Sequence, residues 1–284
     1  MKLTPRKVLQ TIFHMTKIAE IVSRASRSNA ISRFPRLKKI TVDFRSFLYS
    51  GDTVTCPFCR QSFLKFLSYG DSRTRFHRGD MVPAPFRENA LCPVCGSLER
   101  ERLIFLYLTS KTDVLEKNNR LLHVAPEKNL ADFLSASSLI DYVSTDRYDK
   151  TMVRTDVTDM GFKDAAFDEI ICSHVLEHVA DDSKAMSELH RILRPGGMAI
   201  LQVPIAYSLE MTIEGKANDE PEKREELYGQ KNHLRLYGKD YVGRLERAGF
   251  NPQAINPSQI IGDDSIEKYG LNPEEYLFVC FKKR

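Results

Sequence analysis

The chain has 284 residues, of which 42% are hydrophobic and 28% charged, a balance typical of a globular protein with a substantial core. This length fits one large domain, or a medium domain with an appendage. The apolar run Leu103–Leu108 is far too short to span a bilayer, and no sustained apolar stretch typical of a secretory signal follows the first lysine. We therefore expect a cytoplasmic protein.

Positive charge is concentrated in the first 50 residues, which hold eleven Lys and Arg against two acidic residues. The net charge of +4 for the whole chain therefore leaves a net charge of −5 on the remainder. Apolar residues recur at helical spacing from Val8 to Val22, and we expect a basic amphipathic helix there, followed by a linker over residues 26–36. We favour a helix that docks on its own protein. An anionic membrane surface, nucleic acid or a transit-peptide role are the alternatives.

Four of the six cysteines form two matching pairs separated by 32 residues, Cys56-Pro57-Phe58-Cys59 and Cys92-Pro93-Val94-Cys95. A CxxC turn presents two sulfurs together, and zinc prefers four thiolates in a tetrahedron. We therefore predict a zinc ion. Its role should be structural, because four protein ligands leave no open coordination position for a substrate. Four unrelated buried cysteines or a redox pair are the alternatives, but a redox site needs only one pair, at a helix start. The predicted zinc ligands are Cys56, Cys59, Cys92 and Cys95.

The segment from Phe167 to Ile205 predicts a strand, an amphipathic helix and a second strand. Phe167–Cys172 and Met198–Val203 are short apolar runs typical of buried parallel strands. Between them, Asp181-Asp182-Ser183 offers side chains that cap a helix, and Pro195-Gly196-Gly197 ends it. Two parallel strands joined by a helix make a βαβ unit, so we expect an α/β fold with an open sheet.

This segment resembles the second half of a class I S-adenosylmethionine-dependent methyltransferase domain of the type 11 kind. The loop Cys172–His178 after the fourth strand and the turn Leu193-Arg194-Pro195-Gly196-Gly197 before the fifth carry the resemblance. It extends over residues 120–250. The resemblance implies a Rossmann-like, mostly parallel sheet with helices on both faces and an antiparallel last strand. It also implies S-adenosylmethionine as the cofactor.

We divide the chain into a basic arm (1–50), a zinc-ribbon-like module with a bridging helix (51–110) and a methyltransferase domain (111–284). The bridging helix is predicted over Glu99–Leu108. Ile255–Ile261 and Tyr276–Phe281 are predicted as the last two strands.

The resemblance assigns the methionine end of the cofactor to the loop after the first strand, Arg120–Ala125. This loop departs from the family because it contains no glycine. His123 stands where an acid is usual, and Ala125 and Glu127 stand where glycines are usual, so side chains would crowd the approach of the backbone to a ligand. Glu127 would then supply the carboxylate that pairs with the cofactor's amino group.

Two acidic residues are assigned to the nucleoside. Asp146 ends the predicted strand Tyr142–Asp146 and lies twenty residues after Pro126, the spacing at which an acid accepts from ribose hydroxyls. The resemblance further implies that Asp156 accepts from the adenine amino group and that the backbone N–H of Val157 reads the ring. Ser173, in the loop after the fourth strand, completes the predicted cofactor contacts.

Histidines supply the candidate bases. His174-Val175-Leu176-Glu177-His178 matches the H-x-x-E-H motif of inverted zinc peptidases, but such a motif needs a long continuous helix and a further ligand downstream. The resemblance instead places this loop at the mouth of the active site, where His174 or His178 could accept a proton from the substrate. His233 is a third candidate base, and Arg235 a candidate substrate contact.

We therefore predict a methyltransferase that acts on an oxygen or nitrogen nucleophile of a small molecule or glycan, with a sugar hydroxyl as the first choice. The chain lacks an Asn/Asp-Pro-Pro-aromatic loop and a Pro-Cys nucleophile at the end of the fourth strand, which disfavours methylation of exocyclic base amines and of pyrimidine C5, respectively. An RNA methyltransferase that grips RNA through the cysteines and the basic arm is the first alternative. A non-catalytic scaffold with a degenerate cofactor pocket is the second.

Overall fold

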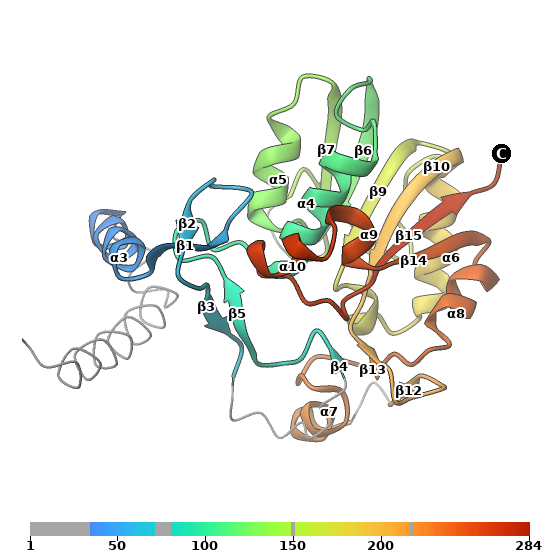
Figure 1. Cartoon of the computed structure of the whole chain (residues 1–284). Coiled ribbons are helices and arrows are strands. Elements are labelled where there is room, and N and C mark those ends of the chain that lie inside the picture. The colour runs from blue at the N-terminus through green and yellow to red at the C-terminus, as the bar shows by residue number, and fades with distance from the viewer. Residues whose placement is uncertain (1–34, 72–80, 149–150, 216–218) are drawn as a thin grey trace, which may run out of the picture.

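The computed structural model describes residues 35–71, 81–148, 151–215 and 219–284. Its centre is a seven-stranded sheet in the order β14-β15-β10-β9-β6-β7-β8 (Figure 1). Strands β6, β7, β8, β9 and β10 run parallel, whereas β15 is antiparallel to both β10 and β14. This confirms the predicted open, mostly parallel sheet with an antiparallel last strand. The strands are β6 (Asn119–Val124), β7 (Ile140–Asp146), β8 (Val153–Arg154), β9 (Phe167–Ser173), β10 (Leu193–Gln202), β14 (Phe250–Ile255) and β15 (Leu277–Lys282).

Helices cover both faces of the sheet, because successive strand residues point into two separate apolar clusters. Ile170 and Leu201 belong to the cluster formed with α6 (Asp182–Ile192) and α8 (Tyr241–Arg247). Their neighbours Ile171 and Ile200 belong to the opposite cluster. That cluster is completed by α4 (Glu99–Lys111), α5 (Lys128–Ser135) and α9 (Pro257–Ile261), which α10 (Asp264–Lys268) follows. The predicted βαβ unit and the bridging helix are therefore both present.

The Pro-Gly-Gly segment lies within β10 and does not itself end the helix as predicted, and its second glycine is required by a close approach. Helix α6 ends at Ile192, and the pairing of β10 with β9 shifts between Leu193 and Met198. A Cβ on Gly197 would lie 2.7 Å from the carbonyl oxygen of Asp168 and 2.9 Å from that of Arg194. Only glycine fits this crossing without moving the backbone.

The predicted strand Ile255–Ile261 is wrong, because the chain turns into a helix at Asn256. The side chain of Asn256 accepts from the backbone N–H of Ser258, and Pro257 occupies the first helical position, where its missing N–H has no cost. The strand is β14 instead. It lies at the edge of the sheet, which tolerates Pro252 within it.

The predicted helix over Val8–Val22 and most of the predicted linker lie outside the described residues. The last residues of that linker begin α3 (Pro35–Leu48), a helix that we did not predict. This helix exposes Ile40 and Phe47, with 62% and 76% of their surface accessible. Within the described ranges, no helix has the length and apolar character needed to cross a membrane.

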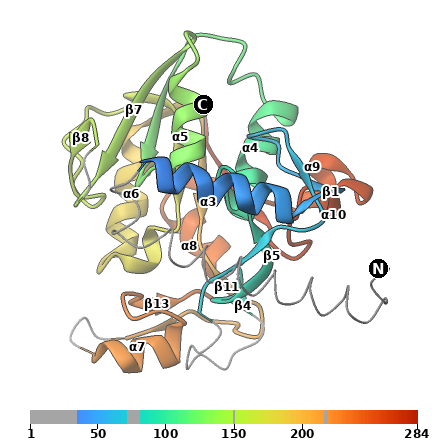
Figure 2. The same ribbon diagram turned by 90° about the vertical axis from the view of Figure 1, so that its left-hand side faces the viewer.

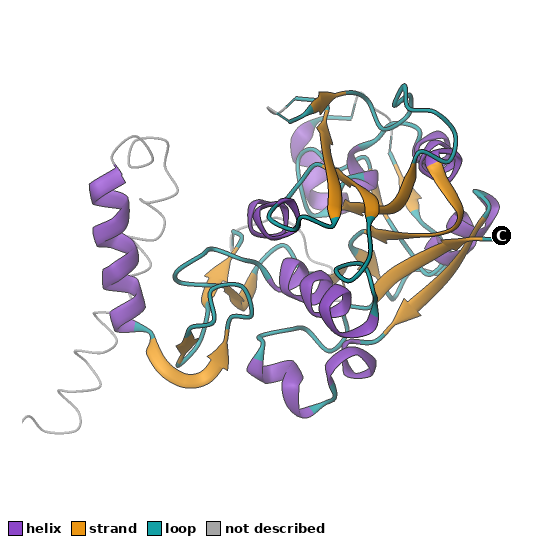
Figure 3. Ribbon diagram, turned by 90° about the horizontal axis from the view of Figure 1, so that it is seen from above, coloured by secondary structure: helices purple, strands orange, loops and turns teal. Residues whose placement is uncertain are grey.

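The two cysteine pairs lie in a small module of short antiparallel strands with its own apolar core. Its position between α3 and the large sheet is visible in Figure 3. We call it the cysteine module. It comprises β1 (Ser50–Thr55), β2 (Ser62–Phe63), β3 (Leu67–Tyr69) and β5 (Arg87–Leu91).

The contacts that join the cysteine module, and the strand β4 (Met81–Val82) between its β3 and β5, to the sheet domain include two that bear on the site. The fully buried guanidinium of Arg102 in α4 donates to the carbonyl oxygens of Ser97, Tyr269 and Gly270 at 2.7–2.9 Å and stacks 4.2 Å from the ring centre of Phe66. Farther along, β4 pairs with β11 (Ile205–Ala206), which follows β10. Figure 2 shows this pair below the sheet, close to α7 (Pro221–Tyr228) and β13 (Arg235–Leu236). Strand β13 pairs in turn with β12 (Ile213–Glu214). The module therefore forms a wall over the end of the sheet.

We predict that Glu169→Gln stabilises the protein at alkaline pH. Burial in β9, followed by the charge of Asp168, raises the pKa of Glu169 to about 8 from an ordinary value of 4.5, although Lys117 opposes the shift. The stability that the protonated form contributes is fully present below pH 4.5 and is lost as pH rises through 8. In denaturant unfolding, the free energy of unfolding of the variant relative to that of the wild type should rise by on the order of a few kcal/mol between pH 5 and pH 9. The exposed Glu116→Gln is the control. A difference that does not change with pH would contradict the prediction.

Candidate functional site

A cavity of about 610 Å³ opens beside the carboxyl end of β9. Parts of the chain far apart in sequence form its walls: the cysteine module, Arg100 of α4, the loop after β9, and α7 with the turn that follows it. Among the lining residues are the three predicted bases His174, His178 and His233. The structure therefore brings together three histidines that the sequence places up to 59 residues apart. Parallel strands of open α/β sheets bind ligands at this edge.

The loop after β9 is held in a conformation that a long helix would not allow. His174 has a left-handed backbone, with φ of +56°, and Leu176–His178 forms a single 3-10 turn. The H-x-x-E-H motif thus lacks the continuous helix that the inverted peptidase motif requires. Arg235 is buried and donates to the carbonyl oxygens of Leu176, Val179 and Ala180. Arg235 therefore fixes the loop and is not the substrate contact that we expected.

Glu177 is fully buried beside the three histidines. Its Oε1 lies 3.3 Å from Nδ1 of His174 and 4.0 Å from Nε2 of His178. The rings of His178 and His233 meet edge to face, with centroids 4.8 Å apart. Nδ1 of His233 lies 2.8 Å from the carbonyl oxygen of Tyr228, and Nδ1 of His178 lies 3.1 Å from that of Asn232. The H-x-x-E-H motif contains three of these four residues, and the fold brings to them His233, the third candidate base from the sequence.

Burial sets the charge states in this cluster. It lowers the pKa of His174, and it lowers the pKa of His233 to about 4. Burial alone would raise the pKa of Glu177, but His174, whose Nδ1 lies 3.3 Å away, and the nearby His178 and His233 bring it to about 2. At neutral pH the site therefore holds a carboxylate beside two neutral imidazoles, each with a lone pair free to accept a proton.

The loop after β6 lies next to this cavity. Its backbone takes a left-handed conformation that glycine usually adopts, although the loop contains no glycine. Ala125 has φ of +49° and donates its N–H to the carbonyl oxygen of Thr145 at 2.8 Å. Glu127 follows, and its Oε1 accepts from Nε of Arg100 at 3.0 Å and from Oγ of Ser173 at 3.2 Å. Since Arg100 also lines the cavity, Glu127 is adjacent to its wall.

The second oxygen of Glu127 is buried without a hydrogen-bond partner. It lies 3.6 Å from Nε2 of His123, which is likewise buried and unpartnered, while Nδ1 of His123 lies 3.1 Å from the hydroxyl oxygen of Tyr142. Burial would raise the pKa of Glu127, but His123 and Arg100 hold it below the ordinary value. The loop thus presents a charged carboxylate oxygen with an unused acceptor site, which fits the ammonium group of an amino-acid ligand.

The predicted nucleoside ligands lie along the same edge. Asp146 ends β7, and its Oδ1 accepts from the N–H of Tyr148 at 2.6 Å. Asp156 follows β8, where it accepts from the N–H and hydroxyl of Thr158 and pairs with Arg147 at 3.0 Å. The N–H of Thr158, ahead of its hydroxyl and Arg147, lowers the pKa of Asp156. Val157 is buried in the core.

The four predicted zinc ligands converge in the cysteine module. Sγ of Cys56 lies 3.5 Å from Sγ of Cys95, and Sγ of Cys59 lies 3.7 Å from Sγ of Cys92. The two turns have the same backbone pattern: Arg60 N–H donates to the Cys56 carbonyl, and Gly96 N–H to the Cys92 carbonyl. Both Arg60 and Gly96 have positive φ, so the first turn has an arginine where the second has a glycine. The four thiolates could hold a metal ion in tetrahedral coordination.

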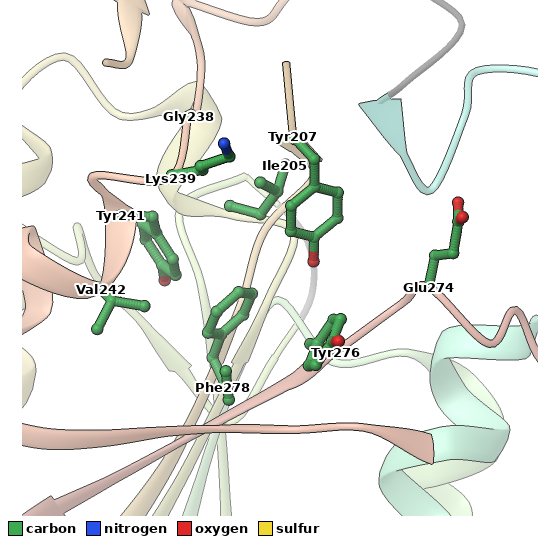
Figure 4. A pocket seen from close by; sticks show the side chains of 10 residues that line it. Ile205, Tyr207, Gly238, Lys239, Tyr241, Val242, Glu274, Tyr276 and Phe278 are labelled. Carbon is green, nitrogen blue, oxygen red and sulfur yellow. The ribbon is translucent and has the colours of Figure 1, made fainter. Parts of the chain in front are cut away.

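A second cavity, of about 530 Å³, lies near β11 and α8 and was missed by the sequence analysis. Figure 4 shows Tyr207, Tyr276 and Phe278 with their rings around a common space. Its lining residues come from several separate segments. No spacing pattern in the sequence could have indicated it.

Comparison with known proteins indicates the class of enzyme. Residues 126–201 match a family model described as "Methyltransferase domain". The chain contains a methyltransferase domain. The match spans the loop after β6 through most of β10, and the strand order is that of the class I fold. The protein is accordingly an S-adenosylmethionine-dependent methyltransferase.

Solved structures similar to this methyltransferase include proteins of different activity. The [4+2]-cyclase SpnF is 15% identical, with 64% of this chain and 81% of that chain covered and a TM-score of 0.42. The 1,6-didemethyltoxoflavin-N1-methyltransferase of Burkholderia thailandensis is 16% identical, with coverage of 64% and 76% and a TM-score of 0.41. The CurJ carbon methyltransferase is 13% identical, with coverage of 65% and 53% and a TM-score of 0.40. Since all three TM-scores lie below 0.5, the fold assignment depends on the strand order itself.

We predict that Ala125→Gly stabilises the methyltransferase, because a left-handed residue with a Cβ costs about 1 kcal/mol that glycine avoids. Denaturant unfolding should place the midpoint of the variant above that of the wild type. Ala131→Gly in the middle of α5 is the matched control, and it should lose about 1 kcal/mol because that position is helical. Equal destabilisation by both substitutions would show that the Ala125 backbone is not strained.

Proposed function

We propose that this methyltransferase acts on an oxygen or nitrogen atom of a polar acceptor, with a sugar or glycan hydroxyl as the first choice. The observation that supports this proposal is the 610 Å³ cavity, where charged and amide side chains surround the three histidines. Its lining includes Arg87, Arg100, Gln230 and Asn232, whose groups suit an acceptor rich in hydroxyls. Tyr69 adds an aromatic face.

The residues at the strand ends would hold the cofactor. The unpartnered oxygen of Glu127 would accept from the amino group, and Asp146 from the ribose hydroxyls. Asp156 and the N–H of Val157 would face adenine, with His123, Ala125 and Ser173 lining the methionine end. When bound, S-adenosylmethionine supplies a methyl group made electrophilic by its positive sulfur.

The histidine cluster would remove the acceptor's proton. Nε2 of His174 is buried without a hydrogen-bond partner, and its Nδ1 faces the Glu177 carboxylate at 3.3 Å. A proton taken up on Nε2 would give an imidazolium that this carboxylate stabilises. The neutral state of His174 at pH 7, set by burial, leaves its lone pair available. His178 and His233 are the other two candidate bases.

We further propose that the four cysteine thiolates hold a structural zinc ion. Without a cation, four sulfurs this close in a partly buried site would repel one another once ionised. The cysteine module contributes Tyr69 and Arg87 to the cavity, so the ion would fix one wall of the acceptor site.

The cofactor proposal predicts that S-adenosylhomocysteine binds the wild type and that Asp146→Ala weakens binding about 10- to 100-fold, the loss expected for hydrogen bonds to a charged group. Titration calorimetry measures both affinities. Asp141→Ala is the matched control, since Asp141 lies in the same strand but is exposed and pairs with Arg120 on the surface. Equal affinities of Asp146→Ala and wild type would contradict the assignment.

The acceptor class is tested with the same variants. Methyl transfer should be detected on saccharides and be lost in Asp146→Ala but not in Asp141→Ala. Transfer to RNA alone, with affinity that falls steeply with salt, would replace the glycan proposal by the RNA alternative. Binding of S-adenosylhomocysteine without methyl transfer to saccharides or to RNA would contradict both the glycan proposal and the RNA alternative.

The zinc proposal predicts one tightly held zinc ion per wild-type chain after dialysis against a mild chelator. Cys92→Ser should lose this ion and unfold at a lower temperature, because binding energy at such sites is folding energy. Elemental analysis and thermal denaturation measure the two effects. The control is Cys280→Ala, a core cysteine of β15, which should retain its zinc. Unchanged zinc in Cys92→Ser would rule out the thiolate site.

A further inference from the structure

Glu177, His178 and His233 bring one ligand atom each to a common point on the wall of the acceptor cavity. These three atoms all lie within 4.8 Å of one another. The site is separate from the four cysteines, which form their own cluster in the cysteine module. It combines two imidazoles with one carboxylate, drawn from the loop after β9 and the turn after α7.

Both imidazoles are oriented as metal ligands are in proteins. The Nδ1 atom of each ring is placed to donate to a backbone carbonyl: His178 to Asn232 at 3.1 Å, and His233 to Tyr228 at 2.8 Å. Such a bond fixes the tautomer and leaves Nε2 with its lone pair, the usual outer-shell arrangement around a metal-bound histidine. The two rings are held edge to face by these contacts.

The carboxylate is incompletely compensated. The side chain of Glu177 is 1% exposed, and although Nδ1 of His174 lies 3.3 Å from Oε1, neither oxygen has a partner with good hydrogen-bond geometry. A buried carboxylate in this position is costly, and the lone pair on Nε2 of His178, 4.0 Å from the same oxygen, would add to the repulsion. Arg235, the buried cation of this loop, is directed at backbone carbonyls. A cation between Glu177 and the two histidines would relieve all three groups at once.

We propose that Glu177, His178 and His233 bind a divalent first-row transition ion, of the class Mn²⁺, Fe²⁺, Co²⁺ or Zn²⁺. Mixed imidazole and carboxylate donors suit these ions, whereas thiolates favour the closed zinc site of the cysteine module. Three protein ligands leave coordination positions open, and these positions face the cavity. The ion is therefore accessible to a ligand in the acceptor site.

The consequence for catalysis rests on the proposed methyltransferase function. An acceptor hydroxyl that coordinates the ion loses its proton at lower pH, because the cation stabilises the oxyanion. The O–H bond breaks, the electron pair stays on oxygen, and Nε2 of His174 takes the proton. His174 then remains the base, while His178 and His233 position the acceptor through the ion.

The test is a titration of the full-length, zinc-loaded protein with Mn²⁺ and with Co²⁺, in the absence of any cofactor. Calorimetry should detect one additional ion per chain. Bound Co²⁺ should show weak visible bands without the near-ultraviolet thiolate charge-transfer band that a cysteine site would give. His178→Gln and Glu177→Gln should each raise Kd by about 100-fold or more, whereas His190→Gln, at the end of α6 where its ring packs on Phe250, should leave it unchanged.

Two results would overturn the proposal. One is the absence of any additional bound ion at millimolar Mn²⁺, Co²⁺ or Zn²⁺, which would leave the cluster as a proton relay without metal. The other is unchanged Kd in His178→Gln, a partly exposed position at which the variant should fold even if Glu177→Gln does not. S-Adenosylhomocysteine affinity is measured on the same zinc-loaded samples before Mn²⁺ or Co²⁺ is added. Retained cofactor-product binding with no ion contradicts only the metal site, and a bound ion without cofactor-product binding contradicts only the proposed function.

Discussion

A carboxylate inside a protein must be compensated, and the position of Glu177 makes this the governing constraint on the site. The 3-10 turn that carries Glu177 is fixed from behind by Arg235, whose guanidinium binds three carbonyl oxygens of the loop. With the backbone held there, the side chain has to face the histidines and the cavity. The unusual backbone of His174 belongs to the same arrangement, because a left-handed residue lets the chain leave β9 and turn at once.

The same edge of the sheet explains why the cofactor residues and the acceptor cavity are adjacent. Strands β6 and β9 are neighbours and parallel, so the loops that follow them leave the sheet side by side. Ser173 at the end of β9 donates to Glu127 after β6, which links the two loops directly. Arg100 contacts the same oxygen of Glu127 from α4, next to the cysteine module. The hydrogen bonds of Glu127 with Ser173 and Arg100 therefore connect the cysteine module, the predicted cofactor loop and the acceptor cavity.

Much of the fold could be predicted from the sequence, because the parallel strands and the α6 helix differ in period and the N-cap at Asp181 is a local signal. The cysteine pairs were predictable for the same reason, since each turn forms within six residues. The contacts that position the site were not. Arg102 and Arg235 look like surface arginines in sequence, and only the tertiary fold brings carbonyl groups to them. Likewise, His233 joins Glu177 through a contact 56 residues away.

The central claim is that one continuous site joins the cofactor residues at the ends of β6 and β7 to the histidine cavity beneath the cysteine module. A crystal structure with bound S-adenosylhomocysteine tests it most directly. The account predicts the amino group beside Glu127, the ribose beside Asp146, and the sulfur open to the cavity that contains His174. A ligand bound elsewhere, or with its sulfur turned away from that cavity, would contradict the account.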